Sequence, residues 1–352
     1  MIRTSNRWQP SSLALAALSA VAAFNLAACA TADARDTSIP AATDLQRVVD
    51  EAHAKYKGLT DGKNADYIPI LATVPSELFG VVITMRDGTT YAAGDVDYLF
   101  SIQSVSKPFT ASLVMHQQEG PQAIIDKIGV EPTGLPFNSK LAVEIYDDRS
   151  VNPLVNAGAI AAVSAVEASS EEERWNLVLG NLSDYAGEPL TVLEEVYKSE
   201  YTSAWSNQNI ANNLFNYERL YSDPEEALRV YTKQCSVGVS ARHLAMMGAT
   251  LANGGVNPKT GKRVLDERHV PELLAVMLTA GFYDESGYWS AWAGLPAKTG
   301  VGGGIVAVVP GKFAIAAFSP RLNEAGNSVR AQKAIQHIAG ELGVGIFGPN
   351  PD

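Results

Sequence analysis

The predicted strands of this chain lie near its two ends, and mostly helical sequence separates them. An apolar stretch broken by one turn predicts a hairpin over residues 78–94, and a second is predicted from strands over 304–309 and 312–318. Between about 120 and 280, apolar residues recur mostly at helical spacing. The individual helices that we expect cover residues 45–58, 155–168, 171–184, 207–220, 223–232, 240–253 and 325–342. This order predicts an α/β (α+β) fold, in which an antiparallel sheet from the N- and C-terminal segments is flanked by helices and carries an inserted all-α lobe.

A serine and a lysine stand three residues apart at the start of an apolar helix. Helical spacing puts Ser104 and Lys107 on one face, one turn apart. The lysine can take the proton of the serine if burial, or a positive neighbour such as Lys298, lowers its pKa. Ser104 would lie at the helix N-terminus, where the helix dipole favours developing negative charge, and Pro108 fits the first turn. Taken alone, this tetrad is also typical of a solvated helix start.

A second short motif far downstream supports a catalytic interpretation of the first. Lys298, Thr299 and Gly300 precede an apolar strand. The pair of motifs resembles the signature of penicillin-recognising serine enzymes, and it favours serine acyl-transfer chemistry. The glycines at 302–304 would let a substrate approach the backbone closely, or would simply form a flexible turn before the strand.

Composition excludes several classes of partner. The 352 residues carry a formal net charge of −11 and no cluster of Lys and Arg, so neither nucleic acid nor an anionic membrane surface is an expected partner. The five histidines show no spacing typical of a metal site, and we predict neither a metal nor a cofactor. Cys235 is expected to be a small buried residue, with a catalytic thiol as the alternative.

The first 28 residues have the pattern of an export signal and are not expected to be part of the folded domain. Arg3 and Arg7 precede an uncharged apolar run, which is typical of a secretory signal peptide over residues 1–28. The run ends in a tetrad that resembles the bacterial lipobox and would make Cys29 the lipidated first residue, with ordinary cleavage nearby as the alternative. Residues 29–44 would then be a flexible tether and 45–352 the folded domain. We expect a lipoprotein on the periplasmic face of a bacterial membrane, or a soluble periplasmic protein if the lipobox is not used.

Several widely spaced stretches narrow the class of enzyme. They are 61–69, 100–107, 129–134, 137–139, 151–160, 234–236 and 294–311. These stretches carry a close resemblance to the bacterial-type serine-dependent glutaminases (the glutaminase A family). The resemblance as a whole runs from about residue 45 to about residue 345. The resemblance implies a β-lactamase-like fold and no cofactor. It implies hydrolysis of L-glutamine to L-glutamate and ammonia through a γ-glutamyl ester on serine. It also implies a homodimer or homotetramer.

The same resemblance implies a role for each matching residue. Ser104 would be the nucleophile, Lys107 the general base, and Tyr231 the phenol that passes a proton to the leaving ammonia. The backbone N–H of Val301 would complete an oxyanion hole with that of Ser104. The substrate-binding residues would be Ser104, Asn156, Glu200, Asn207, Tyr231, Tyr283 and Val301, with Gln103 expected in the same pocket. A carboxylate suits the α-ammonium of glutamine, and amide donors suit its α-carboxylate.

Each of these positions also has a purely structural interpretation. Asn156 and Asn207 could cap helices, Glu200 could be a surface residue, and Tyr231 could be a core residue. The chain departs from the family pattern at Ser206, where arginine is usual, so the loop expected between Glu200 and Asn207 could differ as well.

Two other functions compete with this one. A serine β-lactamase or D,D-peptidase of the cell envelope would suit an exported protein, but the sequence lacks a Ser-Asp-Asn motif at the expected middle position. A catalytically inactive lipoprotein that captures glutamine would need neither Ser104 nor Lys107, and both are present.

Overall fold

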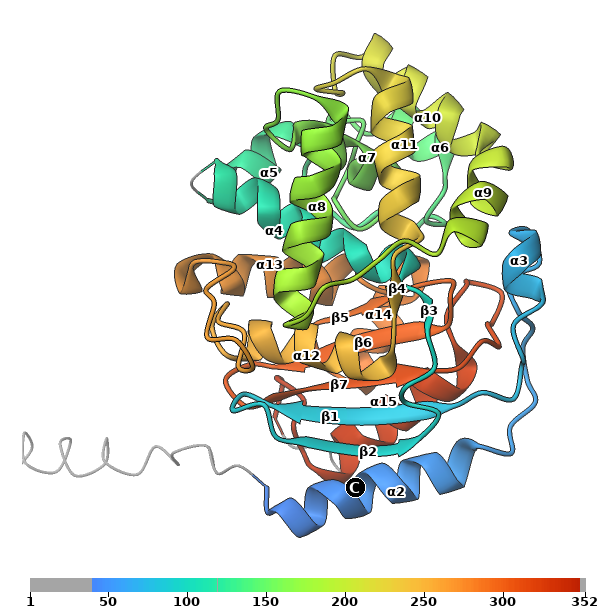
Figure 1. Ribbon diagram of the computed structural model, residues 1–352, viewed down its shortest axis with the longest axis vertical. Coiled ribbons are helices and arrows are strands. Elements are labelled where there is room, and N and C mark those ends of the chain that lie inside the picture. The colour runs from blue at the N-terminus through green and yellow to red at the C-terminus, as the bar shows by residue number, and fades with distance from the viewer. Residues whose placement is uncertain (1–39, 119, 349–352) are drawn as a thin grey trace, which may run out of the picture. The chain divides into compact units, whose positions relative to one another are not determined.

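The centre of the molecule is a five-stranded antiparallel sheet made from both ends of the chain. The computed structural model describes residues 40–118 and 120–348 (Figure 1). The strands follow the order β2 (Thr90–Gly94), β1 (Gly80–Met85), β7 (Phe313–Phe318), β6 (Gly304–Val309) and β5 (Ala297–Thr299). The N-terminal hairpin pairs with the C-terminal one through β1 and β7, in the register Gly80↔Phe318. This pairing confirms the predicted fold class. Lys298 and Thr299 lie within the edge strand β5 itself, which pairs with β6.

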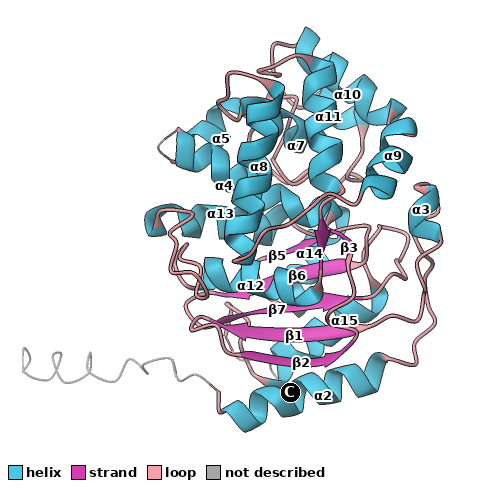
Figure 2. Cartoon of the chain, viewed as in Figure 1, coloured by secondary structure: helices cyan, strands magenta, loops and turns pink. Residues whose placement is uncertain are grey.

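Two layers of helices cover the sheet, because side chains alternate between its faces. On one face, Val81 and Ile83 pack with α2 (Ala42–Tyr56) and α15 (Val329–Glu341). On the other face, Val82 and Val306 pack with α12 (Ala241–Ala252), as Figure 2 shows. Helix α2 begins at Ala42, so the last residues of the predicted tether belong to the first turn of a helix. The described residues from Ala41 onward form one compact unit.

The helical lobe is built around two helices that are almost completely buried. Its members are α4 (Lys107–Gln117), α5 (Gln122–Lys127), α6 (Lys140–Ile145), α7 (Asn156–Ala165), α8 (Glu171–Ala186), α9 (Glu194–Thr202), α10 (Trp205–Asn216) and α11 (Pro224–Cys235). Every residue of α7 is buried, as are the first nine of α4. The small residues of α7 allow this packing: a Cβ on Gly158 would lie 1.7 Å from the Asn152 carbonyl oxygen.

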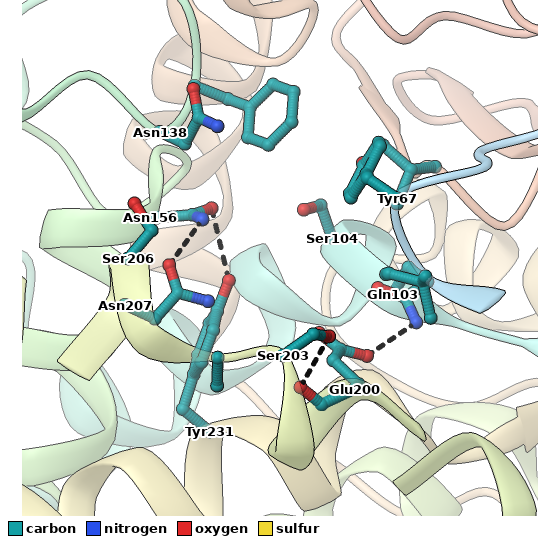
Figure 3. A pocket seen from close by; sticks show the side chains of 14 residues that line it. Tyr67, Gln103, Ser104, Asn138, Asn156, Glu200, Ser203, Ser206, Asn207 and Tyr231 are labelled. Carbon is teal, nitrogen blue, oxygen red and sulfur yellow. Dashed lines mark hydrogen bonds between the residues drawn. The ribbon is translucent and has the colours of Figure 1, made fainter.

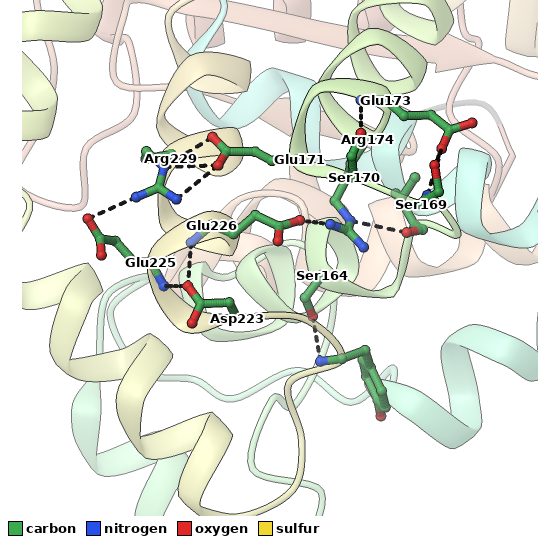
Figure 4. Close-up of polar contacts among 12 residues, drawn as sticks. Ser164, Ser169, Ser170, Glu171, Glu173, Arg174, Asp223, Glu225, Glu226 and Arg229 are labelled. Atoms are coloured by element: carbon green, nitrogen blue, oxygen red, sulfur yellow. Dashed lines mark hydrogen bonds and ion pairs between the residues drawn. The ribbon is translucent and has the colours of Figure 1, made fainter.

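Ion pairs join α11 to α8 across the lobe. The Arg229 guanidinium lies 2.9 Å from the Glu171 carboxylate, and the buried Arg174 pairs with Glu226 (Figure 4). Ser170 caps α8, since its hydroxyl accepts a hydrogen bond from the backbone N–H of Glu173. Helix α11 carries Tyr231, so these ion pairs hold the helix that positions this phenol against α8.

Short elements complete the structure and were not predicted individually. They are α3 (Pro69–Ala72), α13 (Val270–Ala280), α14 (Ser286–Trp292), the 3₁₀ turns η2 (Gln103–Ser106), η3 (Glu267–His269) and η4 (Tyr283–Glu285), and the two-residue strands β3 (Phe100–Ser101) and β4 (Gly238–Val239). Phe100 pairs with Val239 and Ser101 with Gly238. This small ribbon puts the segment before Ser104 beside the segment after Cys235.

The predicted signal peptide and Cys29 lie outside the described residues. Within the described part of the chain, none of the helices is both long enough and apolar enough to span a bilayer.

Candidate active site

Ser104 lies in the tight turn that leads into the central helix of the lobe. It is the second residue of η2, and α4 begins at Lys107, with Pro108 in its first turn as predicted. The first N–H groups of a helical turn have no partner within it, and among the described residues the Ser104 amide makes no hydrogen bond, so it can bind an anion. The side chain of Ser104 is 5% exposed and reaches a small pocket of about 100 Å³.

The pocket brings together most of the residues predicted for the site. Those that line it are Gln103, Ser104, Asn156, Glu200, Asn207, Tyr231 and Val301. Figure 3 shows Ser104 between the Asn156 side of the pocket and the Gln103 side. Lys107 and Tyr283 are buried directly behind this lining, Lys107 in contact with Asn156 and Tyr283 in contact with the ring of Phe137.

Other lining residues were missed by the sequence reasoning. They are Tyr67, Ile68, Phe137, Asn138, Ser203, Ala204 and Ser206. Tyr67, Phe137 and Asn138 fall within stretches that carried the family resemblance, so that signal could have identified them. The serines give no signal of their own, because their place in the pocket depends on how α9 meets α10.

The predicted loop between Glu200 and Asn207 is wrong, since Glu200 lies in α9 and Asn207 in α10, with only a short turn between the helices.

Asn156 is the centre of a hydrogen-bond network on one side of the pocket. Its Oδ1 accepts from Lys107 Nζ at 2.7 Å and from the Tyr231 hydroxyl at 3.1 Å. Its Nδ2 donates to Asn207 Oδ1 at 2.9 Å. The two helices are capped by Val155 and Ala204, so neither Asn156 nor Asn207 is a capping residue. The amide group therefore connects the lysine, the phenol and a second amide at the pocket wall.

Lys107 is almost completely buried, and burial determines its protonation. Burial lowers the pKa of the Lys107 ammonium to about 8, while the Glu200 carboxylate acts in the opposite direction. Within residues 40–118 and 120–348, no hydrogen bond joins Lys107 to Ser104. In sites without substrate, such contacts are often long and tighten only in the reacting complex.

Lys298 does not supply the positive charge expected to act on Lys107. Burial, and next the charge of Lys107, hold the pKa of Lys298 well below its ordinary value. Its Nζ donates to the carbonyl oxygens of Thr299 at 2.8 Å and Gly281 at 3.1 Å, and lies 4.1 Å from the centre of the Tyr283 ring. A Lys298 side chain with so low a pKa is mostly neutral and puts no positive charge beside Lys107. Burial raises the pKa of the Tyr283 phenol, and a hydrogen bond with Ser104 opposes that rise.

Glu200 and Gln103 form the opposite side of the pocket. Gln103 Nε2 donates to Glu200 Oε2 at 2.9 Å, and the carboxylate is buried rather than at the surface. Burial raises the pKa of Glu200 to about 7, with the Gln103 hydrogen bond and the Lys107 charge opposing the rise. Gln103 adopts φ 50, a left-handed conformation that is strained for a residue with a side chain. A buried carboxylate with few donors is well prepared to receive a cation.

Val301 contributes a backbone donor from the turn between β5 and β6. Among the described residues, its N–H has no hydrogen-bond partner, and the residue lines the pocket. The glycines beside it serve the protein's own backbone: a Cβ on Gly302 would lie 2.3 Å from the Ser101 carbonyl oxygen. This close approach, rather than room for substrate, explains the glycine there, and it holds Val301 beside the segment that carries Ser104.

Cys235 is a buried free thiol beneath the site, as expected. Burial raises its pKa far above the ordinary range, and Tyr231 is its hydrogen-bond neighbour. A thiol that stays protonated is a poor nucleophile, so the raised pKa of Cys235 favours Ser104 as the nucleophile. No cluster of His, Cys, Asp and Glu suited to a metal occurs in the part of the chain that the structure describes.

The chain is similar to known proteins over nearly its whole folded length. The Glutaminase family profile matches residues 62–347. A protein named Glutaminase from Colwellia psychrerythraea is 52% identical over 303 residues, covering 86% of this chain and 97% of the relative. Glutaminase 1 of Escherichia coli strain K12 is 50% identical over 306 residues, covering 87% and 98%.

Solved structures agree with the sequence comparison. The structure described as a probable glutaminase, ybaS, superposes with a TM-score of 0.86 at 49% identity and covers 88% of this chain and 99% of its own. A Bacillus glutaminase superposes with a TM-score of 0.77 at 30% identity, covering 87% and 99%. The matches in sequence and in fold span the sheet, the helical lobe and the pocket between them, and the chain belongs to the glutaminase family.

Proposed function

We propose that this protein hydrolyses L-glutamine to L-glutamate and ammonia through an ester on Ser104. The observation that carries the proposal is the Asn156 network, which joins a lysine of lowered pKa and a phenol beside a serine at the start of a helix. A buried carboxylate lies across the same pocket. The chemistry at one side and the charge at the other fit an amide substrate that also carries an ammonium group.

The first half of the reaction forms the ester. Lys107, in its neutral form, accepts the Ser104 proton as Oγ attacks the side-chain amide carbon of glutamine. With a pKa of about 8, roughly a tenth of Lys107 is neutral at pH 7. The oxyanion accepts hydrogen bonds from the backbone N–H groups of Ser104 and Val301. Tyr231, which shares an acceptor with Lys107, passes the proton to the leaving ammonia.

The second half returns the enzyme to its starting state. Water attacks the ester carbon, and the same base accepts its proton. The bond to Ser104 Oγ breaks as the oxygen is reprotonated, and L-glutamate leaves. Every proton taken up by Lys107 is returned, so no external acid or cofactor is needed.

Substrate recognition depends on the two sides of the pocket. Glu200 binds the α-ammonium, supported by the hydrogen bond from Gln103. The amide groups of Asn156 and Asn207 lie on the opposite side and supply donors for the α-carboxylate. Tyr283 lies behind the pocket lining, where its ring packs against that of Phe137.

One assay distinguishes this function from its rivals. The purified full-length protein is incubated with L-glutamine and, separately, with a chromogenic cephalosporin, and ammonia and ring opening are measured. We expect ammonia release that is lost in Ser104→Ala, and no ring opening. Ring opening without ammonia release would support the β-lactamase alternative, and tight glutamine binding without turnover would support the inactive binding protein.

We further propose that the protein is exported and lipidated at Cys29, and that it assembles as a homodimer or homotetramer. The basic start, the apolar run and the tetrad ending at Cys29 support lipidation, and the family resemblance supports assembly. Mass spectrometry of the native N-terminus should find a diacylglyceryl group on Cys29, and an unmodified chain starting elsewhere would contradict it. Light scattering of the purified protein measures the assembly.

A further inference from the structure

Two buried or half-buried amide side chains hold the carboxylate of Glu285. Asn323 Nδ2 donates to both carboxylate oxygens, at 2.9 and 3.1 Å, and Asn327 Nδ2 donates at 2.6 Å. Asn327 is completely buried. Hydrogen bonds to a charged acceptor are about twice as strong as neutral ones. Three such bonds in one place fix the distance between η4, which ends at Glu285, and the loop of residues 320–328.

The loop held in this way supports the back of Val301. Its turn is closed by hydrogen bonds from Asn323 N to the Asn327 carbonyl and from Asn327 N to Asn323 Oδ1, both 2.9 Å. At its tip, a Cβ on Gly326 would lie 3.5 Å from Val301 Cγ1 and 3.5 Å from the Phe137 ring. The backbone of Gly326, at φ 90, thus lies near the Val301 side chain, and Leu322 of the same loop belongs to the same buried cluster as Val301.

On its own side of the contact, Glu285 belongs to η4, the turn that also carries Tyr283. Tyr283 begins η4 and, two residues before Glu285, adopts φ 58. Its hydroxyl donates to the Thr299 carbonyl oxygen at 3.3 Å, and its ring lies 4.8 Å from that of Phe137. Glu285 thus joins the turn that carries Tyr283 to the loop that supports Val301.

We propose that Glu285 is a positioning residue, which fixes the Val301 N–H at the place where the oxyanion develops. The inference rests on the proposed function, because it takes the Val301 N–H as an oxyanion donor. Glu285 touches no substrate in this account; it acts through Asn323, Asn327 and the loop. Loss of its carboxylate removes the contact between η4 and the loop, so the Val301 N–H should be held less precisely. The transition state should then be stabilised less, while bound glutamine is held as before.

The test compares Glu285→Ala and Glu285→Gln with Asp284→Asn, which removes one negative charge from the exposed neighbouring position. We expect kcat to fall about tenfold in Glu285→Ala, less than for loss of a whole oxyanion donor, with KM and the affinity for L-glutamate unchanged within about twofold. A phosphorus analogue of the tetrahedral intermediate should lose affinity by the same factor as kcat. Asp284→Asn should match the parent protein in all three measurements.

Glu285→Gln keeps one acceptor oxygen, so it should fold and show a smaller loss of the same kind. Parent values of kcat in both folded variants would overturn the inference, as would equal losses of affinity for L-glutamate and for the analogue. If the parent protein releases no ammonia, or if Ser104→Ala remains active, the proposed function fails and this inference fails with it. If Ser104→Ala loses ammonia release but the Glu285 variants keep the kcat of the parent protein, this inference alone is wrong.

Discussion

Lys107 Nζ donates a 2.7 Å hydrogen bond to Asn156 Oδ1, and this contact connects the base of the proposed mechanism to the rest of the site. The same oxygen accepts from Tyr231, so one amide group holds the two groups that move protons. An amide is neutral, and it accepts the proton of Lys107 in a hydrogen bond without stabilising the charge as a carboxylate would. This choice of residue is consistent with a lysine whose pKa is about 8.

Replacing this amide by a carboxylate should change the pH dependence. In Asn156→Asp, a negative charge next to Lys107 favours its protonated form and raises its pKa, typically by about 1–3 pH units for a close pair. The rising limb of kcat/KM should therefore move to higher pH by that amount. The control Asn216→Asp, at the exposed end of α10, should leave the profile unchanged. A limb that stays in place would show that Lys107 does not control the rate.

The unmodified protein should itself gain activity as pH rises. The pKa of Glu200, raised to about 7, means that its carboxylate is lost as pH falls through that value, and substrate binding is lost with it. The pKa of Lys107, lowered to about 8, means that the neutral base accumulates as pH rises through that value. Both effects have the same sign, so kcat/KM should rise between about pH 6 and pH 9. A profile that is flat over this range would contradict both assignments.

Glu200 should account for much of the preference for an amino-acid substrate. Loss of a charge-assisted contact in a desolvated pocket costs about 1.5–3 kcal/mol, so Glu200→Ala should lower kcat/KM about ten- to a hundredfold. The matched control is Glu195→Ala, an exposed carboxylate on the same helix. Steady-state kinetics with L-glutamine measure both. Equal activities of the two variants would mean that Glu200 does not bind the substrate.

Gly302 should be intolerant of any side chain. A Cβ there would lie 2.3 Å from the Ser101 carbonyl oxygen and would push the Val301 turn away from the strand that precedes Ser104. Because displacements of about 1 Å in an active site can cost about a hundredfold, Gly302→Ala should lose activity on that scale. Gly287→Ala has open space around it and should keep full activity. Ammonia assays on both folded variants measure the difference, and full activity of Gly302→Ala would exclude this function of the close approach.

The parts of the fold that were predicted correctly have strong local patterns. The second hairpin of the sheet has two continuous apolar strands, and α8 has both a serine cap and acidic residues in its first turn. Helix α9 has no such pattern, because only Val196 and Glu200 are buried on it. The ribbon of β3 and β4 has two residues per strand, which is too short for any period to appear.

The site was predictable in its members but not in its contacts. The spacing of Ser104 and Lys107 predicted a direct partnership, and the family resemblance supplied most of the lining. That Lys107 instead contacts Asn156 depends on how α4 and α7 pack, which no local pattern encodes. The same is true of Glu285, whose partners come about forty residues later in the chain.

Ser104 and Lys107 should behave as one unit in double mutants. Ser104→Ala and Lys107→Ala should each abolish nearly all turnover, and the double variant should be little worse than either, because groups that act in one step are not additive. Ser112→Ala is the matched control, since its buried hydroxyl donates to the Phe109 carbonyl of the same helix and its other neighbour is Tyr185, which does not line the pocket. Losses that multiply in the double variant would show that the two residues act in separate steps.

The most direct measurement of the mechanism is the location of the covalent intermediate. The protein is mixed with L-glutamine, quenched in acid within the first turnovers, digested, and mapped by mass spectrometry. The account predicts a γ-glutamyl ester on the peptide that contains Ser104, absent in Ser104→Ala. A γ-glutamyl group on Cys235 instead, or substantial ammonia release by Ser104→Ala, would contradict the serine mechanism and require a thiol one.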